Sequence, residues 1–203
     1  SEKSSLFSEE SDKRNMSRRA TDMLTKAVNS YQGCAAKLLV RMCAIPSRRP
    51  MVYSFFIDNS IFLHECVRLI PLHYLNVAAY FDEALYFPLM KSLLSGMGSE
   101  ALCVQVNTIQ WCFYYKNEIV CDYVDRIESD PLTHELLVQI YFYGIKGTPA
   151  SKECEKRFEK ILSLDNEEII AKLIEAAMMA YEHAEYRDLS KKILEHYASD
   201  NRE

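Results

Sequence analysis

The sequence predicts an all-α protein of about nine helices, packed either as an irregular α-bundle or as a short α-α superhelical (repeat-like) stack. Apolar residues recur at spacings of three and four along most of the chain, which is typical of one face of a helix. Only 5 glycines and 6 prolines occur among 203 residues, too few for the turns of a fold made of many short strands. The breaks between periodic segments are short, which favours antiparallel helical neighbours. No signature residues repeat at a fixed period, so no named repeat family is indicated.

The chain begins with a polar stretch, residues 1–16, which we interpret as a tail before a single all-α interaction domain over 17–203. Ser17 is a candidate N-cap for the first helix, and Pro46 and Pro50 indicate a loop between them because proline cannot donate to a helix ladder. Between Ser17 and Pro46, apolar residues follow one helical stripe, with Gly33 as a possible interruption. The stripe consists of Ala20, Met23, Leu24, Ala27, Val28, Tyr31, Ala35, Leu38, Leu39, Met42 and Cys43.

The middle of the chain is rich in aromatic residues, because 17 of the 23 aromatic side chains fall within 51–143. The apolar segment 52–57 is compatible with a strand or a buried helix, and the helical spacing that continues to residue 70 favours one helix over 52–70. Pro71 ends that helix or starts the next one. Pro88 indicates a kink or a boundary in the helix that Asp82 is expected to cap. Further helices are expected over 72–80, 101–115, 119–124 and 136–141.

The C-terminal third shows three more helical patterns. One helix is expected to start near Thr148 and Pro149, and a last stripe extends from Tyr186 to Tyr197. Between them, Asp165 followed by Glu168 is the acidic form of a capping box, which predicts a helix start at that point.

Charge and cysteine usage limit the environment of the protein. The net charge of −5 combines +5 for residues 1–50 with −6 for 51–150 and −4 for 151–203. The 7 cysteines are odd in number and contain no CxxC pair, so we expect buried, reduced thiols in the cytoplasm or the nucleus. No apolar run is long enough to cross a membrane. The start at Ser1 without a methionine is expected of a piece excised from a longer intracellular protein.

The residue patterns predict no cofactor, no metal site and no enzyme activity. The histidines lack a second histidine or cysteine at the spacing that zinc requires, and neither a phosphate-binding glycine loop nor a nucleophile elbow occurs. An enzyme with a cysteine nucleophile is the weakest of three functional hypotheses, because many Cys–His pairings are equally compatible with the sequence.

The leading hypothesis is a protein–protein interaction or self-association scaffold domain, because adjacent aromatic residues on a helix cannot all face one core. The surplus rings would contact another protein or a second copy of the chain, as in a homodimer. The equally weighted alternative is that the middle helices are buried on both sides. The expected partner-binding residues are Trp111, Tyr114, Tyr115, Tyr141 and Tyr143.

The second hypothesis is a nuclear, nucleic-acid-associated module that uses the basic N-terminal region. Three basic doublets occur there, and they would contact phosphates if they clustered in space, or serve as an import signal. The residues expected to bind nucleic acid under this hypothesis are Arg14, Arg18, Arg19, Arg48 and Arg49.

Overall fold

The structure, a computed structural model, describes residues 18–75, 82–164 and 166–199. Every regular element in these ranges is a helix, and the predicted all-α class is confirmed. The same ranges hold eleven α-helices, against about nine expected, and two short 3-10 helices. None of the described helices is both long and apolar enough to cross a lipid bilayer.

The chain divides into two compact units, Ser1–Leu132 and Thr133–Glu203, which we describe separately. The tail predicted over 1–16 and the predicted N-cap Ser17 lie outside the described residues. The extent of the single domain predicted over 17–203 stays a prediction.

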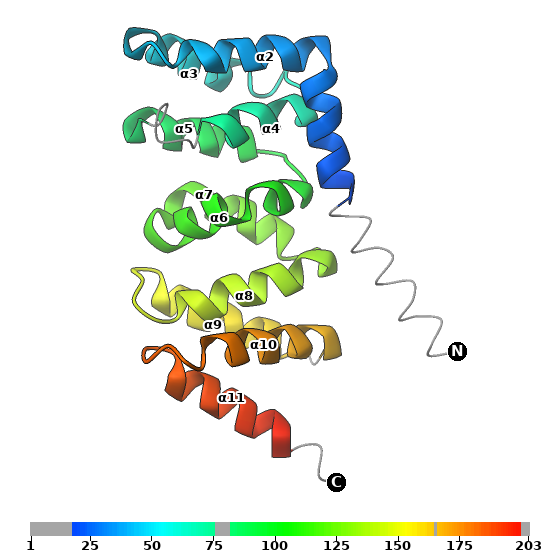
Figure 1. The fold of residues 1–203 in the computed structure, drawn as a ribbon, viewed down its shortest axis with the longest axis vertical. Coiled ribbons are helices and arrows are strands. Elements are labelled where there is room, and N and C mark those ends of the chain that lie inside the picture. Colours follow the sequence, from blue (N-terminus) through cyan, green and yellow to red (C-terminus); the bar gives the residue numbers. More distant parts are fainter. Residues whose placement is uncertain (1–17, 76–81, 165, 200–203) are drawn as a thin grey trace, which may run out of the picture. The chain divides into compact units, whose positions relative to one another are not determined.

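The first unit consists of helix pairs that stack in layers (Figure 1). α2 packs on α4 and α4 on α6, while α3 packs on α5 and α5 on α7. Within this unit the contacts therefore fit the stack better than the irregular bundle. The helices are residues 18–29, α2 (Tyr31–Met42), the 3-10 helix η1 (Pro46–Arg48), α3 (Arg49–Asn59), α4 (Glu65–Tyr74), α5 (Glu83–Leu94), α6 (Glu100–Tyr115) and α7 (Asn117–Ile127).

The second unit follows the 3-10 helix η2 (Pro131–Thr133), which spans the boundary. α8 packs against both α9 and α10, and α10 packs against α11. Its helices are α8 (His134–Gly144), α9 (Ser151–Leu162), α10 (Glu167–Ala180) and α11 (Arg187–Ser199).

Large aromatic side chains fill the core of the first unit. Tyr53, Phe56 and Phe113 are fully enclosed, and both members of the adjacent pair Tyr86–Phe87 are buried. Two neighbouring rings fit inside because α5 is covered by α3 on one side and by α7 on another. For this helix the structure follows the alternative expectation of burial on both sides.

The single helix predicted over 52–70 is wrong, because α3 ends at Asn59 and the chain turns before α4 begins. The Asn59 side-chain amide donates to the Phe55 carbonyl over 2.7 Å, and the Ser60 hydroxyl donates to the Ile57 carbonyl over 3.0 Å. Side chains that occupy the last carbonyls in this way compete with the next turn of helix. The apolar periodicity continues across the turn and conceals it.

Prolines mark fewer boundaries than expected. Pro71 and Pro88 both lie inside helices, α4 and α5. Pro50 lies in the first turn of α3, where its missing N–H has no helical partner to lose. The predicted loop between Pro46 and Pro50 is therefore largely the short helix η1 and the start of α3.

The chain turns abruptly at Ser30, between helix 18–29 and α2 (Figure 1). The Ser30 hydroxyl accepts from the Gly33 N–H and donates to the Ala27 carbonyl, each over 2.9 Å. A Cβ on Gly33 would lie 1.6 Å from that same carbonyl oxygen. The interruption expected at Gly33 thus lies three residues earlier, at Ser30. Position 33 requires glycine because the Ala27 carbonyl lies where a Cβ would be.

The start of α10 uses a different cap from the predicted one. Asp165, the expected capping residue, lies outside the described residues. The Asn166 side-chain oxygen accepts from the Glu168 N–H over 2.9 Å and from the Ile169 N–H over 3.2 Å. Asparagine fills this role because its short side chain reaches the first free N–H groups of the helix.

Candidate interaction surface

Three aromatic side chains, Phe87 from α5 and Trp111 and Tyr115 from α6, form a row at the surface of the first unit. The Phe87 and Trp111 rings are stacked, with centroids 5.8 Å apart and planes 11° apart. The Tyr115 ring continues the row at 5.6 Å from Trp111. We call these three rings the ring ladder. Phe87 is only 6% exposed, whereas Trp111 is 44% and Tyr115 47% exposed, so the ladder extends from the core to the solvent.

α6 presents the two outer rings on one face because Trp111 and Tyr115 are four residues apart. The helix bends at Gln105, whose backbone departs from helical geometry (φ −128°, ψ 28°). The side-chain amide nitrogen of buried Gln105 lies 3.0 Å from Nδ1 of His73 on α4. Trp111 and Tyr115 lie beyond the bend, on the part of α6 that carries the buried Phe113.

A charged pair borders the ladder. The Lys116 ammonium lies 5.3 Å from the centroid of the Phe87 ring, and it makes a 2.9 Å ion pair with the Glu83 carboxylate. The hydrogen bond to Glu83 raises the pKa of Lys116. An apolar row with a cation and an anion at its edge has the makeup of a recognition surface for a polypeptide.

The adjacent residues Tyr114 and Tyr115 differ in exposure, although their rings meet edge-on with centroids 6.4 Å apart. Tyr114 is only 9% exposed, and its hydroxyl accepts from the Gln110 side-chain amide over 2.8 Å. Tyr114 therefore supports α6 from the inside and does not belong to the exposed surface, although the sequence placed it among the partner contacts.

Tyr141 and Tyr143 belong to the second unit, where neither is open in the way that Trp111 is. Tyr141 is fully buried, so its ring is not available to a partner in this structure. Tyr143 is half-buried, and its ring packs edge-on against Tyr186, whose hydroxyl donates to the Tyr143 carbonyl over 2.7 Å. Burial raises the pKa of the Tyr143 phenol. Tyr143 serves to hold the segment before α11 against α8.

The basic residues of the nucleic-acid hypothesis are spread out within the first unit, and Arg14 lies outside the described residues. Exposed Arg18 and Arg19 begin helix 18–29, which ends where α2 begins, whereas Arg48 and Arg49 follow the end of α2. α2, whose 12 residues span about 18 Å, separates the end of helix 18–29 from Arg48 and Arg49. The Arg49 guanidinium also donates to the Cys43 carbonyl over 2.9 Å. Of the three doublets, the structure describes Arg18–Arg19 and Arg48–Arg49, and it does not bring these two together into one phosphate-binding patch.

The buried cysteines are poor nucleophiles. All seven thiols are free, and burial raises the pKa of Cys43 to about 11 and the pKa of Cys112 and Cys154 to about 12. The thiolate is the reactive form, so these three side chains give no support to a cysteine nucleophile. Among the described residues, no three His, Cys, Asp or Glu side chains are grouped so as to hold a metal ion.

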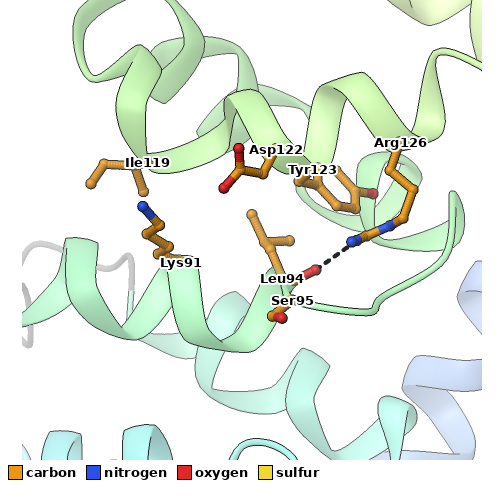
Figure 2. Close-up of a pocket in the computed structure, with 7 residues that line it drawn as sticks. All are labelled: Lys91, Leu94, Ser95, Ile119, Asp122, Tyr123 and Arg126. Atoms are coloured by element: carbon orange, nitrogen blue, oxygen red, sulfur yellow. Dashed lines mark hydrogen bonds between the residues drawn. The ribbon is translucent and has the colours of Figure 1, made fainter.

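A small pocket of about 110 Å³ lies between α5 and α7 in the first unit. Figure 2 shows Arg126 reaching from α7 to the Leu94 carbonyl, and it also donates to the Met97 carbonyl, each over 2.9 Å. The pocket is smaller than the range of about 300–1,000 Å³ that ligand sites occupy. It is lined by Lys91, Leu94, Ser95, Ile119, Asp122, Tyr123 and Arg126.

A second arginine, Arg68 of α4, contacts the C-terminal end of α5 and is 8% exposed. Its guanidinium donates to the Leu93 carbonyl over 3.2 Å and to the Ser95 carbonyl over 2.6 Å. Two arginines from neighbouring helices thus satisfy the carbonyls that the C-terminus of α5 leaves open, and they complement its dipole. This polar cluster is structural.

A larger depression of about 510 Å³ lies in the second unit between α9 and α11. Buried Leu173 and Ile193 are part of its wall, and exposed Lys192 and His196 lie beside them. Its other lining residues are Glu159, Leu162, Ser163 and Tyr197.

The sequence reasoning missed an exposed apolar surface on α2 and α3. Tyr31, Leu38 and Ile45 on and just beyond α2 are 98%, 61% and 48% exposed, and Met51 and Phe55 of α3 are 54% and 42% exposed. We call these five residues the outer face. The signal was present, because the stretch from Leu38 to Cys43 is apolar around most of the helix and not on one side only. It also missed Phe87, the base of the ring ladder.

Comparison with known proteins adds no relative. No family model matches the chain, and no curated protein or solved structure is significantly similar to it.

Proposed function

We propose that this chain is a non-enzymatic protein–protein interaction domain of the scaffold type, and that the ring ladder holds a segment of another protein. One observation carries the proposal: Trp111 and Tyr115 are close to half exposed, yet stacking fixes the Trp111 ring on the buried Phe87. A large ring that is fixed before binding loses little conformational entropy when a partner covers it. Tryptophan and tyrosine are enriched among the residues that dominate the binding energy of protein interfaces.

The cellular setting belongs to the same proposal. Seven free cysteines, three of them fully buried, suit a reducing compartment, so we infer a cytoplasmic or nuclear protein. The Lys116–Glu83 pair at the edge of the ladder would favour a partner segment that is itself amphipathic and carries a charge beside its apolar side chains.

The test compares proteins retained from cell extract by the native chain and by Trp111→Ala and Tyr115→Ala. Tyr181→Ala is the matched control, because Tyr181 is a 43% exposed ring in the second unit. We expect at least one protein to bind the native chain and the control but not the ladder variants. For the purified partner, the loss should be about 2 kcal/mol or more, or roughly 30-fold in Kd.

Trp111 is the only tryptophan in the chain, so its fluorescence reports directly on the ladder. Covering the ring with a bound segment should shift the emission to shorter wavelength in proportion to binding. If all four proteins retain the same partners, or if a partner binds without any change in this emission, the ring ladder is not the binding surface.

A further inference from the structure

α2 carries two apolar faces, and its own unit covers only one of them. Ala36 and Val40 lie on the buried side, where α2 packs on α4. Tyr31 and Leu38 lie on the opposite side and are 98% and 61% exposed. Their seven-residue spacing keeps them in line along one face, because seven residues make almost two full turns. Ile45, just beyond the end of α2, is 48% exposed.

α3 adds a second row beside the first. Met51 and Phe55 are four residues apart and 54% and 42% exposed, and Phe62, just beyond α3, is 79% exposed. α2 and α3 contact each other and form the first layer of the unit, with α4 and α5 on their inner side (Figure 1). Among the described residues of this unit, no helix packs on the outer side of that layer.

The exposed apolar area is large enough for a stable interface. Side chains of this size and exposure present on the order of 100–200 Å² each. The outer face and Phe62 together therefore present roughly 800 Å², which is what one partner contributes to a protein interface of standard size. The largest apolar patch on a typical monomer is about 300–600 Å².

The charges on this layer are arranged so that the face complements itself. Arg41 and Arg48 are exposed toward the end of α2, and Asp58 is exposed toward the end of α3. Because α2 and α3 run in opposite directions, Asp58 lies toward the Tyr31 end of the layer and the arginines toward the Ile45 end. One end is basic and the other carries an acid.

We propose that the outer face binds the outer face of a second copy of this chain, with the two layers antiparallel about a twofold axis. This orientation places the basic end of each copy over the acidic end of the other, whereas the parallel orientation would oppose Arg41 and Arg48 of the two copies. A twofold contact uses the same patch on both subunits, which matches a face that is both apolar and charge-complementary to itself. The inference goes beyond the proposed function, because it uses none of the ring ladder.

The test measures the mass of the whole 203-residue chain by sedimentation equilibrium over about 1–100 µM. We expect the native chain to dimerise in this range. Leu38→Glu should weaken the dimer at least about 30-fold, because it would bury a carboxylate without a partner at the centre of the contact. Met178→Glu is the matched control, because Met178 is a 63% exposed apolar residue in the second unit, and it should leave the dimer unchanged.

A charge exchange tests the antiparallel orientation. Arg41→Glu alone should weaken the dimer, by about threefold to tenfold for a charge pair at the edge of an interface. Arg41→Glu combined with Asp58→Arg should restore most of that loss, since each copy would then again oppose unlike charges. A double variant weaker than Arg41→Glu alone would overturn the orientation.

Two results would overturn the dimer itself. The first is a native chain that stays monomeric throughout the concentration range. The second is a dimer that Leu38→Glu leaves as strong as before, which would place the contact elsewhere. The Trp111 emission separates this proposal from the proposed function: dimerisation through the outer face leaves that emission independent of protein concentration.

Discussion

The helices that close the two units differ in the chemistry of their outer sides. α11, the last helix of the second unit, exposes charged residues such as Lys191, Lys192 and Glu195 and turns Ile193 inward. α2, in the first layer of the first unit, turns Val40 inward but also exposes an apolar row. A helical stack normally ends with a helix whose outer side is polar, because that side meets water.

The comparison shows which side of a terminal helix distinguishes a polar, solvated end of a stack from an apolar one. Both helices bury an inner apolar stripe, so the inner side gives no distinction. α11 adds an i,i+4 ion pair, Lys191–Glu195 at 3.7 Å, on its solvent side, whereas α2 places Tyr31 and Leu38 there. The outer side alone therefore distinguishes the two helices: α11 has the polar outer side typical of a terminal helix, whereas α2 has an apolar one, for which we propose a second copy of the chain as the neighbour.

The largest change in stability is expected on the inner side of α2, where there is no room for an added side-chain atom at Gly33. Gly33→Ala would put a Cβ 1.6 Å from the Ala27 carbonyl oxygen, which forces helix 18–29 away from α2. We expect the free energy of unfolding to fall by about 2–4 kcal/mol, measured by denaturant unfolding. Gly98→Ala is the control: its Cβ would meet only the flexible Glu100 carboxylate. Equal stability of the two variants would contradict the tight junction at Ser30.

A smaller but clear contrast is expected between two cysteines of the same layer. Cys34 is exposed on α2, whereas Cys43 is fully buried and its pKa is raised to about 11. Because only the thiolate reacts, roughly a thousandth of Cys43 is reactive at pH 8, and this fraction increases as the pH approaches 11.

We expect a small alkylating agent at pH 8 to modify Cys34 at least about 100-fold faster than Cys43, as followed by peptide mass spectrometry. The modification of Cys34 should also slow as the protein concentration increases, because the second copy would cover α2. Equal rates at Cys34 and Cys43 would show that the inner side of α2 is open to solvent.

The smallest effect is expected at α11, where the comparison can be reversed. Lys191→Leu with Glu195→Leu, made in the Leu38→Glu background, would give α11 an apolar outer side. Stability should change by only about 0.5 kcal/mol, because both positions are exposed. Weak self-association should appear at high concentration in light scattering. The matched control, Lys191→Gln with Glu195→Gln in the same background, should remain monomeric. A leucine variant that also remains monomeric would contradict the idea that an apolar outer side promotes association.

Local chemistry was sufficient to predict the helical class and several of its boundaries. Helical spacing of apolar residues predicted the helices, and the helix expected over 101–115 is α6 (Glu100–Tyr115). The turn after Asn59 was not predictable from spacing, because Ile61 and Phe62 continue the apolar pattern while side-chain hydrogen bonds end the helix.

The candidate surface was only partly predictable, because exposure depends on which helices cover a residue. Of the predicted partner contacts, Trp111 and Tyr115 are exposed, but the equally aromatic Tyr141 is enclosed, because α8 is covered by both α9 and α10. The row on α2 was read as part of one buried stripe. When a helix is apolar on two sides, which side is exposed can be decided only once the neighbouring helices are known.

The two arginines at the end of α5 have a consequence for tolerance of acid. Their hydrogen-bond partners are the carbonyls of Leu93, Ser95, Leu94 and Met97, which do not titrate, and Arg68 has in addition a weak ion pair with Glu65 at 4.0 Å. An ion pair with a carboxylate weakens in acid, when carboxylates are protonated. As the pH falls, we therefore expect the junction of α4, α5 and α7 to keep these hydrogen bonds after the surface ion pairs are lost.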